Sequence, residues 1–222
     1  MKKTILLFSA LLIFGNLSAQ DKAALVNPII GTNGMGHTFP GACVPFGLVQ
    51  LSPDTDTIPH NVDGKYQPRA YEYCAGYQHK DSSIVGFSHT HFSGTGHSDL
   101  GDILIMPATG ELKLNPGTAT DPDGGYRSRF PHDPEVSRPG YYEVMLADYG
   151  VKAQLTATKR VGVHKYTFPK EAKNQRIILD MIHGIYNYDG KVLWTNIRVE
   201  NDTLVTGYRI TNGWARTNYT YF

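Results

Sequence analysis

The second half of this sequence repeats one pattern many times: a short run of β-branched and aromatic residues, followed by Gly, Pro, Asp or Asn. Such runs predict β-strands, and the residues between them predict turns. After the N-terminus, no window shows sustained helical spacing of apolar residues. Many short strands at regular spacing are typical of a sandwich or a barrel. The sequence therefore predicts an all-β fold, with strands at 141–146, 151–158, 161–168, 177–181, 192–199 and 203–210.

The first half carries fewer strand signals and longer polar segments. Buried strands are predicted at 46–51, closed by Pro53, and also at 84–87 and 103–106. Residues 55–69 are polar and contain two prolines, which predicts a long loop. Residues 115–140 are rich in Gly, Pro, Asp and Arg and are also expected to be mostly loop. Asn201 and Asp202 are expected to form a hairpin turn.

Residues 1–19 have the parts of a bacterial export signal. Lys2 and Lys3 precede an apolar run at 5–14, and Ala19 supplies a small residue for cleavage. The apolar run is too short for a stable membrane anchor, and no Cys follows the cut to carry a lipid. The alternative, a buried N-terminal helix, fits the Lys-Lys start poorly. We therefore expect an exported protein, periplasmic or secreted, with no stable membrane anchor.

The composition suits a globular domain and gives no sign of a charged partner. Of the 222 residues, 41% are hydrophobic and 18% are charged, which argues against disorder. The formal net charge of +1 gives no electrostatic reason to expect nucleic acid as a partner. Cys43 and Cys74 permit one disulfide in an exported protein, but two free buried thiols are the favoured interpretation.

The densest polar cluster in the sequence is 88–99, which contains three histidines and two glycines. It follows the predicted strand at 84–87. If that strand continues, His89 and His91 project to the same side, because side chains two positions apart share a face. Such a pair could bind a metal or grip hydroxyl groups, and the glycines would let a ligand approach the backbone closely.

Two other interpretations of the histidine pair are open at this point. The His-x-His spacing resembles the start of the metallo-β-lactamase signature, but Ser93 and Gly94 stand where that signature needs Asp and His. A zinc hydrolase is therefore disfavoured, since the ligand set is incomplete. In the second interpretation, His89 and His91 satisfy hydrogen bonds within a packed loop and bind nothing.

Other motifs are weaker. The Gly-rich loop at 31–36 lacks the Lys and the following helix of a phosphate-binding loop. Asp54 with Asp56, and Asp121 with Asp123, could be paired carboxylates. Both pairs lie in polar loops with prolines nearby, so turn or capping roles are favoured over acid/base catalysis.

Taken together, the ordered motifs resemble the N-terminal domain of glycoside hydrolase family 92, a family of exo-α-mannosidases. The resemblance runs from about Asn27 to the C-terminus. It rests on Asn27-Pro28-Ile29-Ile30-Gly31-Thr32, Gly36-His37-Thr38-Phe39-Pro40-Gly41-Ala42, Val44-Pro45-Phe46-Gly47, Cys74-Ala75-Gly76-Tyr77, Gly86 to Gly96, Gly101-Asp102-Ile103-Leu104, Pro139-Gly140-Tyr141-Tyr142 and Gly213-Trp214-Ala215.

The resemblance implies a β-sandwich over residues 20–222, followed in the family by a catalytic (α/α)₆ barrel that this chain lacks. The implied enzyme is a Ca²⁺-dependent, inverting exo-α-mannosidase acting on mannose-containing N-glycans or mannans. Both catalytic carboxylates and most Ca²⁺ contacts are expected in the missing barrel. We therefore expect no catalytic residue and no metal ligand in this chain, which should be inactive alone, whether it is a fragment or a truncated gene product.

The resemblance also implies that loops of the sandwich close one wall of the mannose pocket. The candidate substrate-binding residues are His37, Thr38, Tyr71, Cys74, His89, His91, Gly94, Thr95 and Gly96. The chain departs from many family members in having Tyr71 where a Trp is common and Ala75 in place of Ser, which puts linkage preference in doubt. Two alternatives are a free-standing carbohydrate-binding module and a structural β domain without a ligand.

Overall fold

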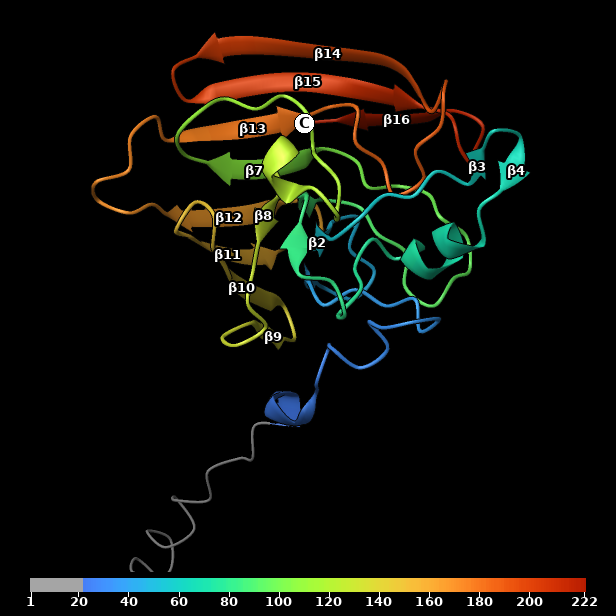
Figure 1. The fold of residues 1–222 in the computed structure, drawn as a ribbon, viewed down its shortest axis with the longest axis horizontal. Helices are drawn as coiled ribbons and strands as arrows, with labels where there is room; N and C mark the ends of the chain where they lie inside the picture. Colours follow the sequence, from blue (N-terminus) through green and yellow to red (C-terminus); the bar gives the residue numbers. More distant parts are fainter. Residues whose placement is uncertain (1–21) are drawn as a thin grey trace, which may run out of the picture.

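The computed structural model describes residues 22–222, and this part of the chain is almost entirely β-strand and loop (Figure 1). The predicted signal at 1–19 lies outside the described residues. None of the described helices is long and apolar enough to cross a membrane. The elements are η1 (Lys22–Leu25), β1 (Ala42–Cys43), β2 (Gln50–Asp54), β3 (Asn61–Val62), β4 (Lys65–Tyr66), η2 (Pro68–Tyr73), β5 (Ser83–Ile84), β6 (Gly86–Ser88), β7 (Leu104–Ala108), η3 (Pro122–Gly124), β8 (Ser128–Arg129), β9 (Val136–Arg138), β10 (Tyr141–Leu146), β11 (Val151–Ala157), β12 (Gly162–Thr167), β13 (Arg176–Asp180), β14 (Val192–Asn201), β15 (Leu204–Thr211) and β16 (Asn218–Tyr221).

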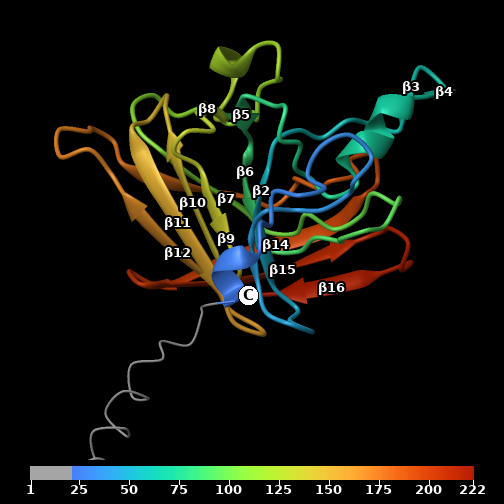
Figure 2. The same cartoon turned by 90° about the horizontal axis from the view of Figure 1, so that it is seen from below.

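Two antiparallel sheets enclose the main core. One has the strand order β1-β2-β6-β7-β13, and the other has the order β12-β11-β10-β9. They pack through β1 and β2 of the first sheet against β10 and β11 of the second, and Figure 2 shows the two layers side by side. The core between them contains side chains from both sheets, among them Leu51, Phe87, Val144 and Leu155. The prediction of an all-β fold is confirmed.

The sequence pattern of β10 and β11 explains why this core forms. Along both strands, buried residues alternate with more exposed ones, as expected where one face of a sheet is covered. The register pairs Tyr142 with Leu155 and Val144 with Ala153, so the apolar side chains of both strands share one face. Each fully buried side chain of this kind contributes about 1.5–3 kcal/mol, which fixes the register against a slip of one residue.

A third sheet, β14-β15-β16, is separate from the other two and lies along one side of the molecule (Figure 1). The predicted hairpin joins β14 and β15, but its turn residues are Asp202 and Thr203, because Asn201 ends β14 and pairs with Leu204. Unlike β10, β14 shows no alternation, because both of its faces are largely exposed. The sheet therefore leaves many large apolar side chains in solvent: Leu193, Trp194, Ile197, Val199, Leu204, Val205, Tyr219, Tyr221 and Phe222.

One predicted strand is displaced. The sequence predicted a strand at 46–51 that ends before Pro53, but β2 begins at Gln50 and contains Pro53. Phe46 is instead fully exposed in a turn, with a left-handed φ of 58°. Pro53 fits within β2 because β1 pairs only as far as Leu51, so beyond that point β2 has a neighbour on one side only.

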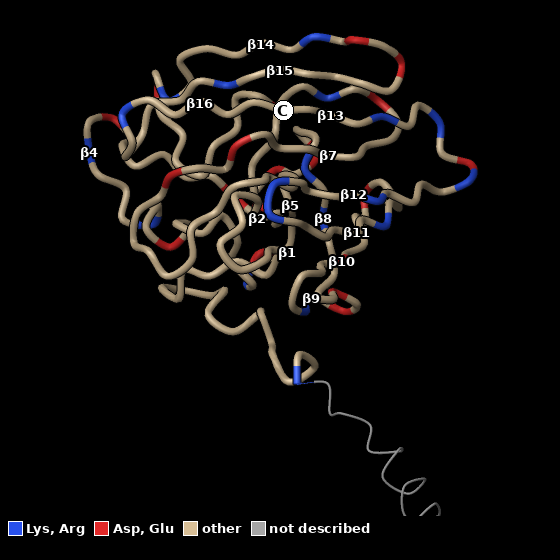
Figure 3. Tube along the Cα trace, turned by 180° about the vertical axis from the view of Figure 1, so that it is seen from behind, with Lys and Arg blue, Asp and Glu red and all other residues tan. Residues whose placement is uncertain are grey.

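The two segments expected to be loops are largely irregular, with small additions. Residues 55–69 contain the short β3–β4 hairpin and the start of η2, and residues 115–140 contain η3, β8 and β9. Charged residues of both signs are interspersed along the chain (Figure 3).

Candidate functional site

The structure brings the loop around His37 and the loop at 89–96 together, as the family resemblance implies for loops that close one wall of a pocket. The Gly94 amide donates to the His37 carbonyl at 2.6 Å, and the Phe39 and His91 rings lie 5.3 Å apart. Tyr71, on η2, packs edge-on against the His37 ring with centroids 4.7 Å apart. A Cβ on Gly96 would overlap the Tyr71 hydroxyl, so the loop can lie against this ring only because Gly96 has no side chain.

These residues differ in how much surface they present to a ligand. Tyr71 is 38% exposed, and Gly94 and Gly96 are also exposed. Thr95 is half-buried, as is Thr38, whose hydroxyl donates to the Ile30 carbonyl at 3.0 Å. His37 is buried with a left-handed φ of 52°, and its Nε2 has no hydrogen-bond partner among the described residues. The exposed part of the site is therefore the Tyr71 ring and the glycine loop.

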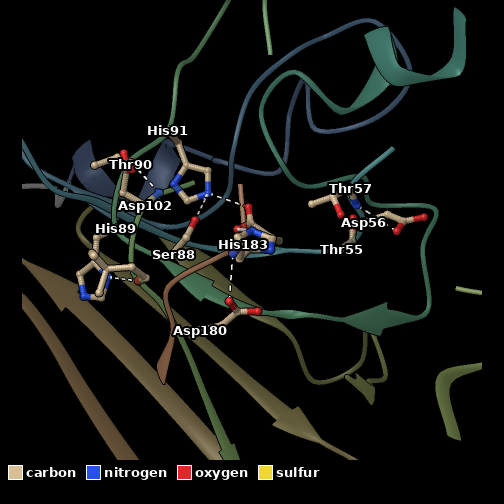
Figure 4. Close-up of polar contacts among 12 residues, drawn as sticks. Thr55, Asp56, Thr57, Ser88, His89, Thr90, His91, Asp102, Asp180 and His183 are labelled. Atoms are coloured by element: carbon tan, nitrogen blue, oxygen red, sulfur yellow. Dashed lines mark hydrogen bonds and ion pairs between the residues drawn. The ribbon is translucent and has the colours of Figure 1, made fainter. Parts of the chain in front are cut away.

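His91 is buried and belongs to an ion-pair network. Its Nδ1 donates to the Gln50 carbonyl at 2.7 Å, and its Nε2 lies 2.9 Å from Asp54 Oδ1. His183 Nε2 binds the other carboxylate oxygen, Oδ2, at 2.7 Å. Because Nδ1 already donates to a carbonyl, the contact with Asp54 requires a second proton, which makes it an imidazolium–carboxylate pair. Figure 4 shows His91 and His183 converging from different segments.

The carboxyl of Asp54 at the centre of this network is wholly buried. Burial raises the pKa of Asp54, but the charge and hydrogen bonds of His91 and His183 outweigh that effect and hold the pKa well below its usual range. Gly76 passes directly over this carboxyl with φ +79°, where a Cβ would overlap Oδ1. The expectation that Asp54 serves a turn or a cap is therefore wrong, because its side chain points into the core.

His89 lies apart from His91 and has its own partners (Figure 4). Strand β6 ends at Ser88, so the condition for both rings to share a face is not met. His89 Nδ1 donates to the Ile103 carbonyl at 2.7 Å, which leaves Nε2 to accept from His164 Nε2 at 3.0 Å. His164 Nδ1 in turn accepts from the Tyr166 hydroxyl at 2.7 Å. This chain of hydrogen bonds ties the loop to β12 with both imidazoles neutral.

Burial agrees with that arrangement. It lowers the pKa of His164 to about 3, helped by the neighbouring His89, and it also lowers the pKa of His89. All four ring nitrogens of His89 and His91 therefore have partners within the described protein. This favours the interpretation in which the two histidines hold the loop in place.

The cysteines are both free, which agrees with the favoured interpretation. Cys74 is buried and accepts a hydrogen bond from the Ser98 hydroxyl at 3.3 Å. Burial raises the pKa of the Cys74 thiol, so it is not activated as a nucleophile. Cys43 is exposed at the end of the short strand β1, so the expectation that both thiols are buried is wrong for this residue.

The remaining carboxylates near the loops are also engaged. Asp99 pairs with Lys191 and accepts the Trp214 amide at 2.9 Å. Asp102 accepts from the Thr90 hydroxyl at 2.8 Å and lies 3.4 Å from Arg209 Nε. Their basic partners come from the segment after β13 and from β15. The sequence analysis missed them, since nothing local links positions about a hundred residues apart.

Asp121 and Asp56 come closer to the turn and capping roles predicted for them. Asp121 Oδ1 accepts the Gly124 amide at 3.2 Å and so caps η3, as expected. Asp56 Oδ1 accepts the Thr57 amide at 2.9 Å and lies 3.4 Å from the buried Arg127. Asp121 and Asp56 thus each bind a backbone amide close to them in the sequence, and only Arg127 is a partner from a distant part of the chain.

Comparison with known proteins decides the family. Residues 25–222 match the model of the glycosyl hydrolase family 92 N-terminal domain. The chain belongs to glycoside hydrolase family 92. Its fold matches a family GH92 alpha-mannosidase of Bacteroides thetaiotaomicron, solved in complex with mannoimidazole, with a TM-score of 0.80 and 45% identity over 90% of this chain. It also matches the family GH92 inverting mannosidase of Bacteroides thetaiotaomicron VPI-5482, with a TM-score of 0.62 and 26% identity.

The family relatives are much longer than this chain. The chain covers 24% and 25% of the two mannosidase structures. An uncharacterized secreted glycosidase of Arthroderma benhamiae is 31% identical over 157 residues, which are 67% of this chain and 18% of the relative. The chain thus spans about a quarter or less of the length of these family 92 proteins.

Proposed function

We propose that this chain forms one wall of the mannose pocket in a Ca²⁺-dependent, inverting exo-α-mannosidase that acts on mannose-containing N-glycans or mannans. Its family relatives include alpha-mannosidases, one solved with mannoimidazole and one described as inverting. The wall would comprise His37, Thr38, Tyr71, Cys74, His89, His91, Gly94, Thr95 and Gly96. We assign the sugar-facing part to Tyr71 and the Gly94–Gly96 loop, and a positioning role to the buried His91 and Cys74.

The exposed Tyr71 ring is the observation that carries this proposal. It stands between the two loops, held at its hydroxyl end by Gly96 and on its side by the His37 ring. A partly exposed aromatic ring beside a glycine loop suits a sugar, because the C–H groups of a sugar pack on aromatic faces and its hydroxyls bind polar groups of a loop.

The carboxylates near the loops support the proposal that the chain is inactive alone. Inverting hydrolysis needs two carboxyl groups about 6.5–9.5 Å apart that are free to act as acid and base. Near the loops, Asp54, Asp99 and Asp102 are buried and paired with cationic or hydroxyl side chains. We therefore propose that both catalytic carboxylates come from an (α/α)₆ domain outside this chain.

The proposed Ca²⁺ is not expected to bind here. Ca²⁺ prefers six to eight oxygen ligands, including several carboxylates. Among the described residues, the one group of clustered ligand atoms contains two imidazoles and a single carboxylate. That donor set does not fit Ca²⁺, so we propose that its ligands lie mainly outside this chain and derive no step through the ion.

The exposed apolar side chains of the third sheet support the proposal that another domain covers this sheet. Apolar side chains on β14 and β16, such as Trp194, Val199 and Tyr221, form a surface that soluble domains usually cover. Because the relatives extend far beyond the part matched here, we propose that the catalytic domain packs on this sheet.

The proposal is tested with Tyr71→Ala in the full-length enzyme, and Tyr66→Ala, which removes another exposed tyrosine on β4, serves as the matched control. We expect Tyr71→Ala to lower kcat/KM for an aryl α-mannoside on the order of tenfold, equivalent to about 1.4 kcal/mol of binding. Tyr66→Ala should act as the parent does. Equal activity of both variants, or robust turnover by residues 20–222 alone, would refute the proposal.

One observation favours the second candidate, a free-standing carbohydrate-binding module. His97, Tyr186, Tyr188, Gly213 and Trp214 line a cavity of about 440 Å³, with the His97 and Trp214 rings edge-on at 4.7 Å. Saturable binding of α-mannobiose by the chain alone, measured by isothermal titration calorimetry and lost in Trp214→Ala, would support this module.

A further inference from the structure

Three potential metal ligands meet where the segment after η2 approaches the start of β9. His79 Nδ1, His132 Nδ1 and a carboxylate oxygen of Glu135 all lie within 4.8 Å of one another. His132 Nδ1 is 2.7 Å from Glu135 Oε2, and His79 Nδ1 is 3.9 Å from the same oxygen. None of these residues is in the set proposed to face a sugar.

Glu135 has a buried carboxylate with two histidines as its ion-pair partners. Its side chain is 2% exposed. In the described part of the chain its ion-pair partners are the two histidines, and no Lys or Arg pairs with it. A buried carboxylate without a cation is strongly unfavourable. A cation bound between the carboxylate and the two imidazoles would supply the missing positive charge.

The second oxygen of Glu135 is held by two tyrosines. Oε1 accepts from the Tyr77 hydroxyl at 2.7 Å and from the Tyr142 hydroxyl at 2.6 Å. Tyr142 is a fully buried core residue, so its hydroxyl position is fixed. The two bonds orient the carboxylate so that Oε2 faces the histidines. Such outer contacts, which orient a ligand, are a regular feature of metal sites.

The hydrogen bonds of His132 also fit a metal ligand. Its Nε2 lies 3.0 Å from the Asp81 carbonyl, which can only accept, so Nε2 carries a proton. A neutral His132 ring then directs the Nδ1 lone pair at the Glu135 carboxylate. Two acceptors at that separation repel each other unless a proton or a metal ion lies between them.

His79 completes the set. The Tyr77 hydroxyl gives its proton to Glu135, so it does not donate to His79 Nδ1, which lies 3.4 Å away. Both imidazoles are partly open to solvent, with side chains 41% and 33% exposed for His79 and His132. A metal ion bound here would therefore have a route from solvent and room for a water molecule.

We propose that His79 Nδ1, His132 Nδ1 and Glu135 Oε2 bind a first-row transition-metal dication, with Zn²⁺ the best fit. Two imidazoles, one carboxylate and a water make a four-coordinate zinc set, with ligand bonds of about 2.0–2.2 Å. Tetrahedral ligands at that distance lie about 3.3 Å from each other. From the present 2.7 and 3.9 Å, His132 Nδ1 therefore has to move about 0.6 Å away from Glu135 Oε2, and His79 Nδ1 about 0.6 Å toward it.

The site would stabilise the loop that precedes His37. The His79 amide donates to the Thr32 carbonyl at 2.8 Å. The adjacent Gln78 side chain binds Gly34 twice, accepting from its amide at 2.8 Å and donating to its carbonyl at 3.0 Å. A metal that fixes His79 to Glu135 therefore also fixes the Gly31–Gly36 loop against β9.

The test uses the chain without a polyhistidine tag, stripped of metal. Zn²⁺ is titrated calorimetrically, and Co²⁺ is titrated by visible absorption, which reports four-coordinate geometry. We expect one Zn²⁺ per chain, intense Co²⁺ absorption, and a higher melting temperature with Zn²⁺. His132→Gln and Glu135→Gln should lose at least tenfold in affinity. His97→Gln, which removes a histidine outside the cluster, should bind as the parent does, and Ca²⁺ should not compete.

Several results would overturn the proposal. These are no saturable one-to-one binding by the folded parent, unchanged affinity in His132→Gln, or an equal loss in His97→Gln. Glu135→Gln retains both tyrosine hydrogen bonds, and circular dichroism reports whether it folds. If it does not fold, the partly exposed His79→Gln decides the question, since a parent-like affinity in that variant would exclude the site.

Discussion

Replacing Asp54 by Asn tests the buried network behind the candidate site. Asn keeps the shape but removes the charge that His91 Nε2 and His183 Nε2 contact at 2.9 and 2.7 Å. Removing one partner of a buried ion pair costs about 3–5 kcal/mol, because the remaining charge is left without compensation. For a domain of this size, 1 kcal/mol shifts the melting temperature by about 2–4 °C. We therefore expect Asp54→Asn to lower the melting temperature by roughly 6–20 °C.

The matched control is Asp123→Asn. Asp123 also pairs with a cationic side chain, Arg129, but it is 76% exposed, and such surface pairs contribute little to stability because water and salt screen them. Urea unfolding of both variants gives the free energies, provided that the slope with denaturant is unchanged. Similar losses in Asp54→Asn and Asp123→Asn would refute the reasoning.

The pH dependence gives a second readout of the same change. The native pKa of Asp54 is lowered, so the unfolded chain takes up a proton before the folded one does. The stabilisation by Asp54 is thus present above the unfolded value near 4 and is lost as the pH falls below it. Asp54→Asn should flatten this acid limb of the stability curve. An acid limb as steep as that of the parent would contradict the assignment.

Three further predictions follow from other parts of the structure. Burial lowers the pKa of His164 to about 3, so between about pH 6.5 and 3 the unfolded chain binds a proton that the folded chain does not, and stability falls as the pH drops. His164→Gln should reduce this dependence of stability on pH, measured by urea unfolding at several pH values, and an unchanged dependence would contradict the prediction. A thiol reagent should modify the exposed Cys43 in the native chain but reach Cys74 only after unfolding, as read by mass spectrometry, and equal rates would contradict the burial. The chain alone should bind a hydrophobic dye through the third sheet, and Trp194→Lys with Val199→Lys should reduce that fluorescence, whereas undiminished dye binding would place the exposed apolar surface elsewhere.

Local pattern was sufficient for most of the fold. The strand predicted at 141–146 matches β10, and those at 151–158 and 161–168 differ from β11 and β12 by a residue or so at their ends. These segments follow one rule over their whole length, since alternate residues face the core. The prediction is wrong at 46–51, because Pro53 lies inside β2 and does not end the strand. Whether a strand has neighbours on both sides is decided by the assembled sheet, so the local sequence could not show that β2 tolerates a proline there.

The candidate site was predictable only in part. The family resemblance implied that the loops around His37 and at 89–96 form one wall, and the hydrogen bond between His37 and Gly94 shows that they lie together. It did not predict that Asp54 turns into the core to meet His183, because those residues are 129 positions apart. Protonation and burial are set by such distant partners.

The sequence by itself determined the all-β class, most strand positions and the ordered motifs that resemble family 92, since each depends on neighbouring residues. Only the tertiary structure decided which polar side chains are exposed and which are locked in pairs. His91 and Tyr71 stood side by side as candidate ligand-binding residues in the sequence, yet one is buried against Asp54 and the other is open to solvent. The physical reason is that burial of a polar group depends on the partners that the fold brings to it, and those partners come from strands far away along the chain.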